Sequence, residues 1–261
     1  MNKTLAKLIK NETFKKFVLS KCRYCPGGNV KLGKQILTWS KLYHHKEHDI
    51  ADIMPGINVT CKGSCKKEYC SGCCSTCYVK KSYDLHGYSV KKGHAWRTLA
   101  TRFWIDELET ELDDQLTRKR KKAEVVRLDQ SGELETLKEF IMHVNIAKNH
   151  PETVFFIYTK AFDIVIKYML EHEHDFPKNF IILISIWNEY GIKEYNMVKH
   201  MDNVKAFVVR TGFNYKEHGI IPTCVCEAYI GGKLNKKETC YKCKKCFDND
   251  PKHKVILCDE H

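Results

Sequence analysis

The fourteen cysteines are the residues of this chain best suited to chemistry. They form three groups, two near the N-terminus, six in the middle and six near the C-terminus, and residues 78–223 contain none. A disulfide-dependent fold would spread its bridges along the chain, whereas clustered cysteines are typical of metal ligands in a reducing compartment. The pattern therefore predicts metal or iron–sulfur sites in a protein of the reducing cytosol.

The middle group is the densest, and its spacing suits an iron–sulfur cluster. Cys70, Cys74 and Cys77 give C-x3-C-x2-C, followed directly by Tyr78. Three thiolates can hold three corners of a [4Fe–4S] cube and leave the fourth iron open, whereas a cluster that only carries electrons is closed by four cysteines. An open iron is a position for a cofactor or substrate.

Two alternatives remain for this group. Additional cysteines, among them Cys73, surround the motif, and Cys61, Cys65 and Cys74 form another possible ligand set. Zinc is the other candidate metal, because loops with C-x2-C units often bind it tetrahedrally to hold a loop in place.

Outside the cysteine groups, the sequence predicts strands that alternate with helices. Strands are predicted over residues 35–39, 123–129, 153–159, 179–187 and 203–210, and helices over 3–20, 94–122, 133–149, 162–173 and 191–201. Such alternation predicts right-handed βαβ units and a mostly parallel sheet. Five to six strands are too few for a closed eight-stranded barrel, so we expect a partial (β/α) barrel or an open α/β sheet.

Three parts follow from this organisation. Residues 1–34 form an N-terminal helix with a Cys-x2-Cys extension, residues 35–215 form the partial barrel with its cysteine loop at 61–78, and residues 216–261 form a cysteine-rich metal-binding segment. Ligands of parallel α/β proteins bind at the carboxyl ends of the strands. Lys160 directly follows the strand predicted over 153–159 and is a candidate contact for a cofactor or substrate. A lysine that merely caps the strand end is an equally good interpretation of this position.

C-x3-C-x2-C followed by an aromatic residue resembles the signature of the radical S-adenosylmethionine (SAM) superfamily. In that family the motif follows the first strand of a partial (β/α) barrel, as it does here. The resemblance implies that the open iron binds SAM and that Ser131, Gly132 and Glu133 stand where a glycine-rich motif holds the SAM amino group. Ser185 and Asn188 correspond to the groups that hold its ribose.

The resemblance also implies an activity. A reduced cluster would cleave SAM to methionine and a 5′-deoxyadenosyl radical, which starts radical chemistry on a substrate. The electron would come from a donor such as flavodoxin or ferredoxin.

A closer likeness is to the uncharacterised phage and bacterial family called gene product 88. The stretches VRLDQSGEL, FFIYTKA and PKNFIILIS carry it, together with the C-terminal cysteines and His261. It covers roughly residues 30–261 and implies a phage or mobile-element origin without a settled activity. The expected location is accordingly the cytoplasm of a bacterium or of a phage-infected host.

The C-terminal cysteines predict a second metal centre. Cys240, Cys243 and Cys246 have C-x2-C-x2-C spacing, and Cys226 or Cys258 is available as a fourth ligand, as is Cys224. This spacing resembles that of ferredoxins and of auxiliary clusters on radical SAM enzymes, and it equally suits a structural zinc site.

The charge of the chain bears on its partners. The formal net charge is +12, and a basic surface attracts polyanions. The unknown substrate is therefore expected to be a nucleotide, a nucleic acid or a peptide, although dispersed lysines also serve solubility. No run of about 18 apolar residues predicts a membrane span, and the N-terminus has no secretory pattern. The alternative hypothesis is a non-catalytic phage protein, held together by zinc or a cluster, that binds nucleic acid.

Overall fold

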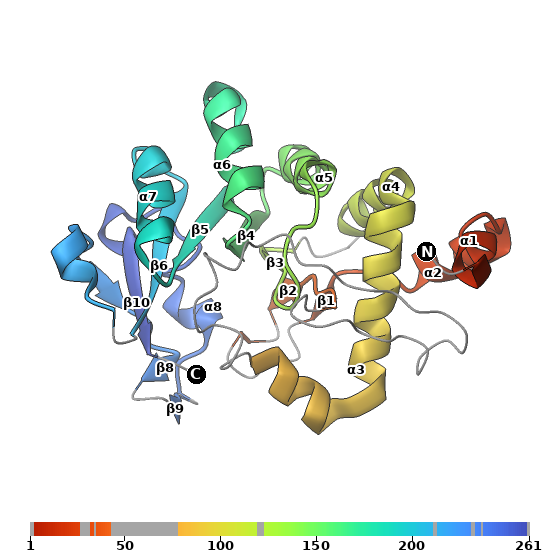
Figure 1. Cartoon of the computed structure of the whole chain (residues 1–261), viewed down its shortest axis with the longest axis horizontal. Coiled ribbons are helices and arrows are strands. Elements are labelled where there is room, and N and C mark those ends of the chain that lie inside the picture. Colours follow the sequence, from red (N-terminus) through yellow and green to blue (C-terminus); the bar gives the residue numbers. More distant parts are fainter. Residues whose placement is uncertain are drawn as a thin grey trace.

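A mostly parallel open sheet forms the centre of the molecule (Figure 1). The computed structural model describes residues 3–26, 32–33, 35–42, 78–118, 123–210, 213–230, 233–235 and 237–259. The eight strands, in spatial order, are β1 (Cys25–Pro26), β2 (Ile36–Thr38), β3 (Val125–Leu128), β4 (Val154–Thr159), β5 (Phe180–Ile186), β6 (Val204–Arg210), β10 (Val255–Asp259) and β7 (Cys224–Val225). Within this sheet β1 pairs antiparallel with β2, and the other pairs are parallel.

The five strands expected from the sequence are confirmed as β2 to β6, and the sheet is not closed. Three further strands were not expected. Two of them, β10 and β7, come from the cysteine-rich C-terminal segment, and β10 pairs with β6 along its whole length. A separate antiparallel pair joins β8 (Tyr229–Ile230) to β9 (Lys233–Leu234).

Eight α-helices lie in the described part of the chain. They are α1 (Lys3–Leu8), α2 (Glu12–Ser20), α3 (Tyr78–Phe103), α4 (Ile105–Thr117), α5 (Leu137–Asn149), α6 (Phe162–Glu171), α7 (Glu189–Val198) and α8 (Cys240–Cys243). The helix expected over 3–20 is two helices, because the Asn11 side chain caps α2 by accepting from the Phe14 amide. The helix expected over 94–122 already starts at Tyr78 and breaks at Trp104, whose φ of −142° is not helical.

The strand order explains how the sheet is covered. From β2 to β6 the strands follow one another in space as they do along the chain, so right-handed crossovers place the connecting helices on one face. Figure 1 shows α4, α5, α6 and α7 on that face, with α8, β8 and β9 on the other. We call the latter the second face. Side chains of β5 alternate between the two: Phe180 and Ile182 pack under the helices, whereas Ile181 packs on the second face.

Both faces are buried, as expected for parallel strands. All seven residues of β5 are buried, which accounts for its continuous apolar sequence. No helix in the described part of the chain is long and apolar enough to cross a membrane.

His143 on α5 is a fully buried member of the core on the helix side. Its ring meets that of Trp39 edge-on at 6.5 Å, and neither ring nitrogen has a hydrogen-bond partner among the described residues. Burial, assisted by the charge of Lys41, lowers the pKa of His143 to about 3. The histidine is therefore neutral in the folded protein.

We predict that His143→Phe makes folding less sensitive to acid. Because the folded pKa lies below the ordinary value, only the unfolded state takes up the proton as pH falls from about 6.5 towards 3, which destabilises the fold by up to about 1.4 kcal/mol per pH unit. Urea unfolding between pH 7 and pH 4 should show a shallower loss for His143→Phe than for the wild type. The exposed His174 provides the control, His174→Phe, and equal slopes for all three proteins would contradict the prediction.

Candidate functional site

The candidate site lies at the carboxyl ends of β2, β3 and β4. Residues 39–42 continue from the end of β2 towards the segment that carries the six middle cysteines, and we call them the loop root. The metal ligands predicted at Cys70, Cys74 and Cys77, with Cys61, Cys65 and Cys73, lie outside the described residues. The structure describes the chain up to Leu42, after it leaves the sheet at the end of β2, and again from Tyr78, where α3 begins.

The loop root is hydrogen-bonded to the turn that follows β3. The Trp39 amide donates to the Arg127 carbonyl over 2.9 Å, and the Gln130 amide donates to the Trp39 carbonyl over 3.0 Å. Two residues after Trp39, the Lys41 amide donates to the Ser131 carbonyl over 2.7 Å, and the Ser131 hydroxyl donates back to the Lys41 carbonyl over 2.8 Å. The parallel pairing of β2 with β3 thus continues beyond both strands.

Gly132 allows this close approach. Its φ is +93°, a region that favours glycine. A Cβ atom there would lie 2.9 Å from the Cβ of Lys41 and 3.3 Å from the carbonyl oxygen of Leu42. The glycine is therefore required both by its backbone conformation and by the proximity of the loop root.

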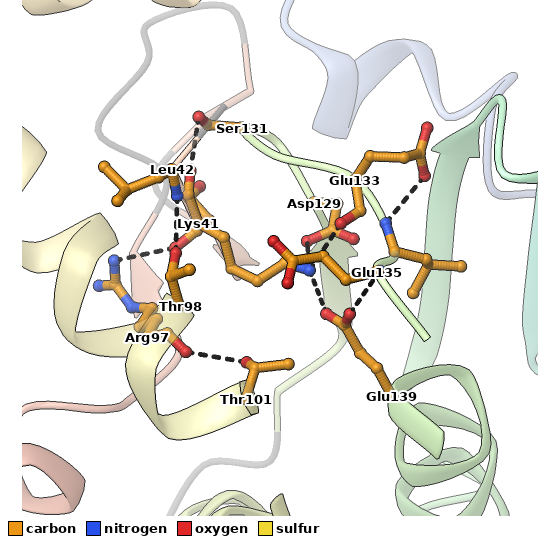
Figure 2. A network of polar contacts seen from close by, with 12 residues as sticks. Lys41, Leu42, Arg97, Thr98, Thr101, Asp129, Ser131, Glu133, Glu135 and Glu139 are labelled. Carbon is orange, nitrogen blue, oxygen red and sulfur yellow. Dashed lines mark hydrogen bonds and ion pairs between the residues drawn. The ribbon is translucent and has the colours of Figure 1, made fainter. Parts of the chain in front are cut away.

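Lys41 is the centre of a buried charge network (Figure 2). Its side chain is 1% exposed, and its Nζ donates to the Glu133 carbonyl over 2.7 Å. The same ammonium forms an ion pair with Glu139 and lies 3.6 Å from Oδ1 of Asp129, and both of those side chains are fully buried. Asp129 follows β3 directly with a φ of +44°, which turns the chain there.

Two buried carboxylates share this one ammonium, and the environment opposes their ionisation. Burial raises the pKa of Asp129 well above its usual range, and it raises that of Glu139 as well, in both cases against the attraction of Lys41. Burial also opposes the charge on Lys41, but Asp129 and Glu139 outweigh it and raise its pKa. Neither carboxylate oxygen of Asp129 has a hydrogen-bond donor among the described residues. The buried carboxylates of Asp129 and Glu139 therefore depend on Lys41 for their counter-charge.

Glu133 joins the ends of β3 and β4. Its carboxylate accepts hydrogen bonds from the Thr159 hydroxyl at 2.8 Å, the Lys160 amide at 2.8 Å and the Leu134 amide at 3.1 Å. Burial raises its pKa, and these donors oppose the shift. The carboxylate is thus engaged by the protein itself, and a SAM amino group would have to share it.

The other predicted contacts lie at the ends of β4 and β5. The Lys160 ammonium lies over the Trp187 ring, 5.2 Å from its centroid, and the Trp187 indole donates to the Ser185 hydroxyl over 3.1 Å. The Asn188 side chain caps α7 by accepting from the Gly191 amide at 3.3 Å. Ser131, Gly132, Glu133 and Lys160 thus belong to one connected site, and Trp187 links Lys160 to Ser185.

The sequence did not single out Lys41, Glu139 or Trp187 as site residues. Glu139 carried a signal, because it stands three residues after Thr136, the spacing of a helix-capping box. The Thr136 hydroxyl does accept from the Glu139 amide over 3.2 Å, but the Glu139 carboxylate serves Lys41 and the Glu135 amide. No pattern in the sequence marked Lys41 as a site residue.

The C-terminal cysteines lie on the second face, away from this site. Cys226, Cys246 and Cys258 are buried in the apolar cluster there, and Cys240 packs against it. Cys243 is half-buried. Across the described ranges, no three His, Cys, Asp or Glu side chains are grouped as ligands of a metal ion.

Comparison with known proteins gives one match. The family model described as Gene product 88 matches residues 19–249. No curated protein matches the chain, and neither does any solved structure.

We predict that Lys41→Met destabilises the protein by about 3–5 kcal/mol near neutral pH, because it leaves two buried carboxylates without their counter-charge. Lys138→Met is the matched control: Lys138 pairs with Asp106 over 2.8 Å with both side chains exposed, and its loss should cost less than about 1 kcal/mol. Urea denaturation measures both. Similar costs for the two variants would show that the buried network does not hold the fold.

We also predict that Gly132→Ala costs more stability than Gly219→Ala. Gly219 has a φ of +73°, and no described atom lies within 4 Å of the position that its Cβ would take, so its substitution reports backbone strain alone, about 1–2 kcal/mol. Gly132→Ala adds the overlap with Lys41, which should cost at least about 1 kcal/mol more. Thermal unfolding of the two variants compares them, and equal losses would argue against the close contact.

Proposed function

The chain belongs to the gene product 88 family, and on that premise we propose that it is an iron–sulfur enzyme that binds SAM and cleaves it reductively. The loop root carries the proposal. It precedes the segment with Cys70, Cys74 and Cys77 in the sequence, and it lies beside the turn formed by Ser131 to Glu133, at the edge of the sheet where parallel α/β proteins bind ligands.

The topology supports the proposal. Strands β2 to β6 follow chain order with their helices on one face, as in a (β/α) barrel, whereas a doubly wound sheet reverses its strand order and has helices on both faces. We infer that the open sheet is a partial barrel.

The described residues at this edge fit a small charged cofactor. The Lys160 ammonium and the Ser185 hydroxyl provide a positive charge and a polar group at the neighbouring strand ends. An amino acid moiety and a ribose offer complementary groups.

Each part of the site has a role in this proposal. Bound [4Fe–4S] would supply the electron that breaks a carbon–sulfur bond of SAM. Lys41, with Asp129 and Glu139, holds the loop root against the sheet. Glu133 keeps the ends of β3 and β4 in register, and the Trp187 ring shields one side of Lys160 from water.

The remaining partners follow from charge and chemistry. A net charge of +12 supports a nucleotide or nucleic acid as substrate over a peptide. The reduction requires a one-electron donor such as flavodoxin or ferredoxin. If the protein does not cleave SAM, the alternative is a metal-containing protein that binds nucleic acid without catalysing a reaction.

We predict that the anaerobically reconstituted, dithionite-reduced protein cleaves SAM to methionine and a 5′-deoxyadenosyl radical. Without substrate, the radical takes a hydrogen atom from a C–H bond of a buffer component or of the protein, and chromatography measures the resulting 5′-deoxyadenosine. Cys74→Ala should lower the rate at least about 100-fold, because a cluster held by two thiolates is lost or misplaced. Cys73→Ala is the matched control in the same segment and should retain the activity.

One result would refute the enzymatic function, and another would revise the set of cluster ligands. Intact SAM after incubation with cluster-loaded, reduced wild type would refute the enzymatic function. Loss of activity in Cys61→Ala, with retention in Cys70→Ala, would move the ligand set to Cys61, Cys65 and Cys74.

A further inference from the structure

The first two helices hold half of the formal net charge of the chain. Residues 3–23, which cover α1 and α2, contain seven basic residues and one acidic residue, a net charge of +6 out of +12. Six of the basic side chains are exposed and have no carboxylate partner among the described residues: Lys3, Lys7, Lys10, Lys16, Lys21 and Arg23. We call the surface that these six side chains form the basic surface. Figure 1 shows its two helices at the end of the molecule opposite the C-terminal segment.

The apolar side of α2 is already occupied by the core. Phe14 meets the Trp96 ring edge-on at 6.3 Å, and Val18 is fully buried among the core residues on the helix side. Lys15, the remaining basic residue, pairs with Glu107 of α4 over 2.9 Å. A helix that binds a membrane surface needs its apolar side for the lipid. The charged side of α2 is therefore the side that is available to a partner, and it favours a soluble polyanion.

The positions of the cations in α1 do not stabilise that helix. Lys3 and Lys7 are one turn apart, so two like charges lie on the same side of the helix. Lys3 also stands in the first turn, where the helix dipole favours acidic residues, and that turn contains none. Solubility would be served equally well by charges of either sign. A polyanionic partner accounts for positive charges that the fold itself does not use.

An aromatic ring lies within the basic surface. Phe17 is 45% exposed, and Lys16, Ser20 and Lys21 are exposed on the same side of α2. The Lys21 ammonium lies 5.1 Å from the centroid of the Phe17 ring, and the Trp96 ring packs against it edge-on at 5.5 Å. Proteins bind single-stranded nucleic acid by stacking bases on such rings while cations contact the phosphates. Because a duplex hides the faces of its bases, the exposed ring favours a single strand.

We propose that the basic surface binds single-stranded nucleic acid, with its lysines against the phosphates and Phe17 stacked on a base. The flexible Lys21 side chain gives way to the base and turns to a phosphate. Because the lysines release counterions from the strand, the affinity falls as the salt concentration rises. The binding needs neither SAM nor a cluster, so it is independent of the proposed enzymatic function.

Fluorescence anisotropy of a labelled oligothymidylate, titrated with the full chain at several salt concentrations, tests the role of the lysines. The test variant replaces three lysines of the basic surface: Lys7→Gln, Lys16→Gln and Lys21→Gln. The control has the same net charge and replaces three exposed lysines in or next to α6 and α7: Lys167→Gln, Lys193→Gln and Lys199→Gln. The test variant should bind at least about ten-fold more weakly at low salt, and its slope of log affinity against log salt should be smaller by about two. The control should stay within about two-fold of the wild type, because its charges lie elsewhere.

A second variant separates stacking from charge. Phe17→Ala should weaken binding of the oligothymidylate about ten-fold and leave the salt slope unchanged. Leu170→Ala is the matched control, because it removes an apolar side chain of similar exposure, 40%, from α6, and it should bind as the wild type does.

Three results would overturn the proposal. The first is equal affinity of the two lysine variants, and the second is a duplex bound as tightly as the single strand with no effect of Phe17→Ala. The third is binding to phosphatidylserine vesicles without binding to the oligothymidylate, which would make the partner a membrane. A cluster-loaded, reduced wild type that binds the oligothymidylate but leaves SAM intact refutes the proposed function alone. A wild type that cleaves SAM without binding the oligothymidylate overturns this inference alone.

Discussion

The ion pair of Lys41 with Asp129 and Glu139 is the interaction on which the site depends. It brings a residue of the loop root, a residue that follows β3 and a residue of α5 to one buried point. Burying these charges costs free energy that their attraction only partly returns, so an apolar triad of the same volume would hold the fold at least as well. What the charged groups add is a defined geometry, because the Lys41 ammonium is satisfied where the Glu133 carbonyl and the carboxylates of Glu139 and Asp129 meet.

This geometry positions the loop root, after which the cysteine segment follows in the sequence. The backbone bonds between Lys41 and Ser131, and the absence of a side chain at Gly132, keep the loop root against the turn after β3. The ends of β3 and β4 are joined in turn by Glu133. The candidate site thus lies at the carboxyl edge of the sheet, whereas the C-terminal segment packs on the second face.

Much of the fold could be predicted from the sequence, and the reason lies in burial. Strands β4 and β5 are covered on both faces, and their apolar runs mark them without ambiguity. The apolar stretch of β10 (Val255–Asp259) carries a similar signal, but it lies in a segment dominated by cysteines and was not recognised as a strand. The break between α1 and α2 was missed because the cap formed by Asn11 competes with an otherwise continuous helical pattern.

The site was predictable only in part. The turn with Gly132 and Glu133 follows a strand, and position along the chain was enough to place it. Lys41 and Glu139 are 98 residues apart, and no local pattern links two such charges. Glu133 shows a further limit, because its location was predicted but its bonds to the end of β4 arise from tertiary packing.

Electron paramagnetic resonance of the dithionite-reduced protein, recorded with and without SAM, tests the central claim most directly. If the cysteine segment presents an open iron at this edge of the sheet, the reduced protein should show a [4Fe–4S] signal whose g values change when SAM binds. A signal that SAM leaves unchanged would mean that the cluster has no open iron there, and the complete absence of a cluster signal after reconstitution would contradict the account altogether.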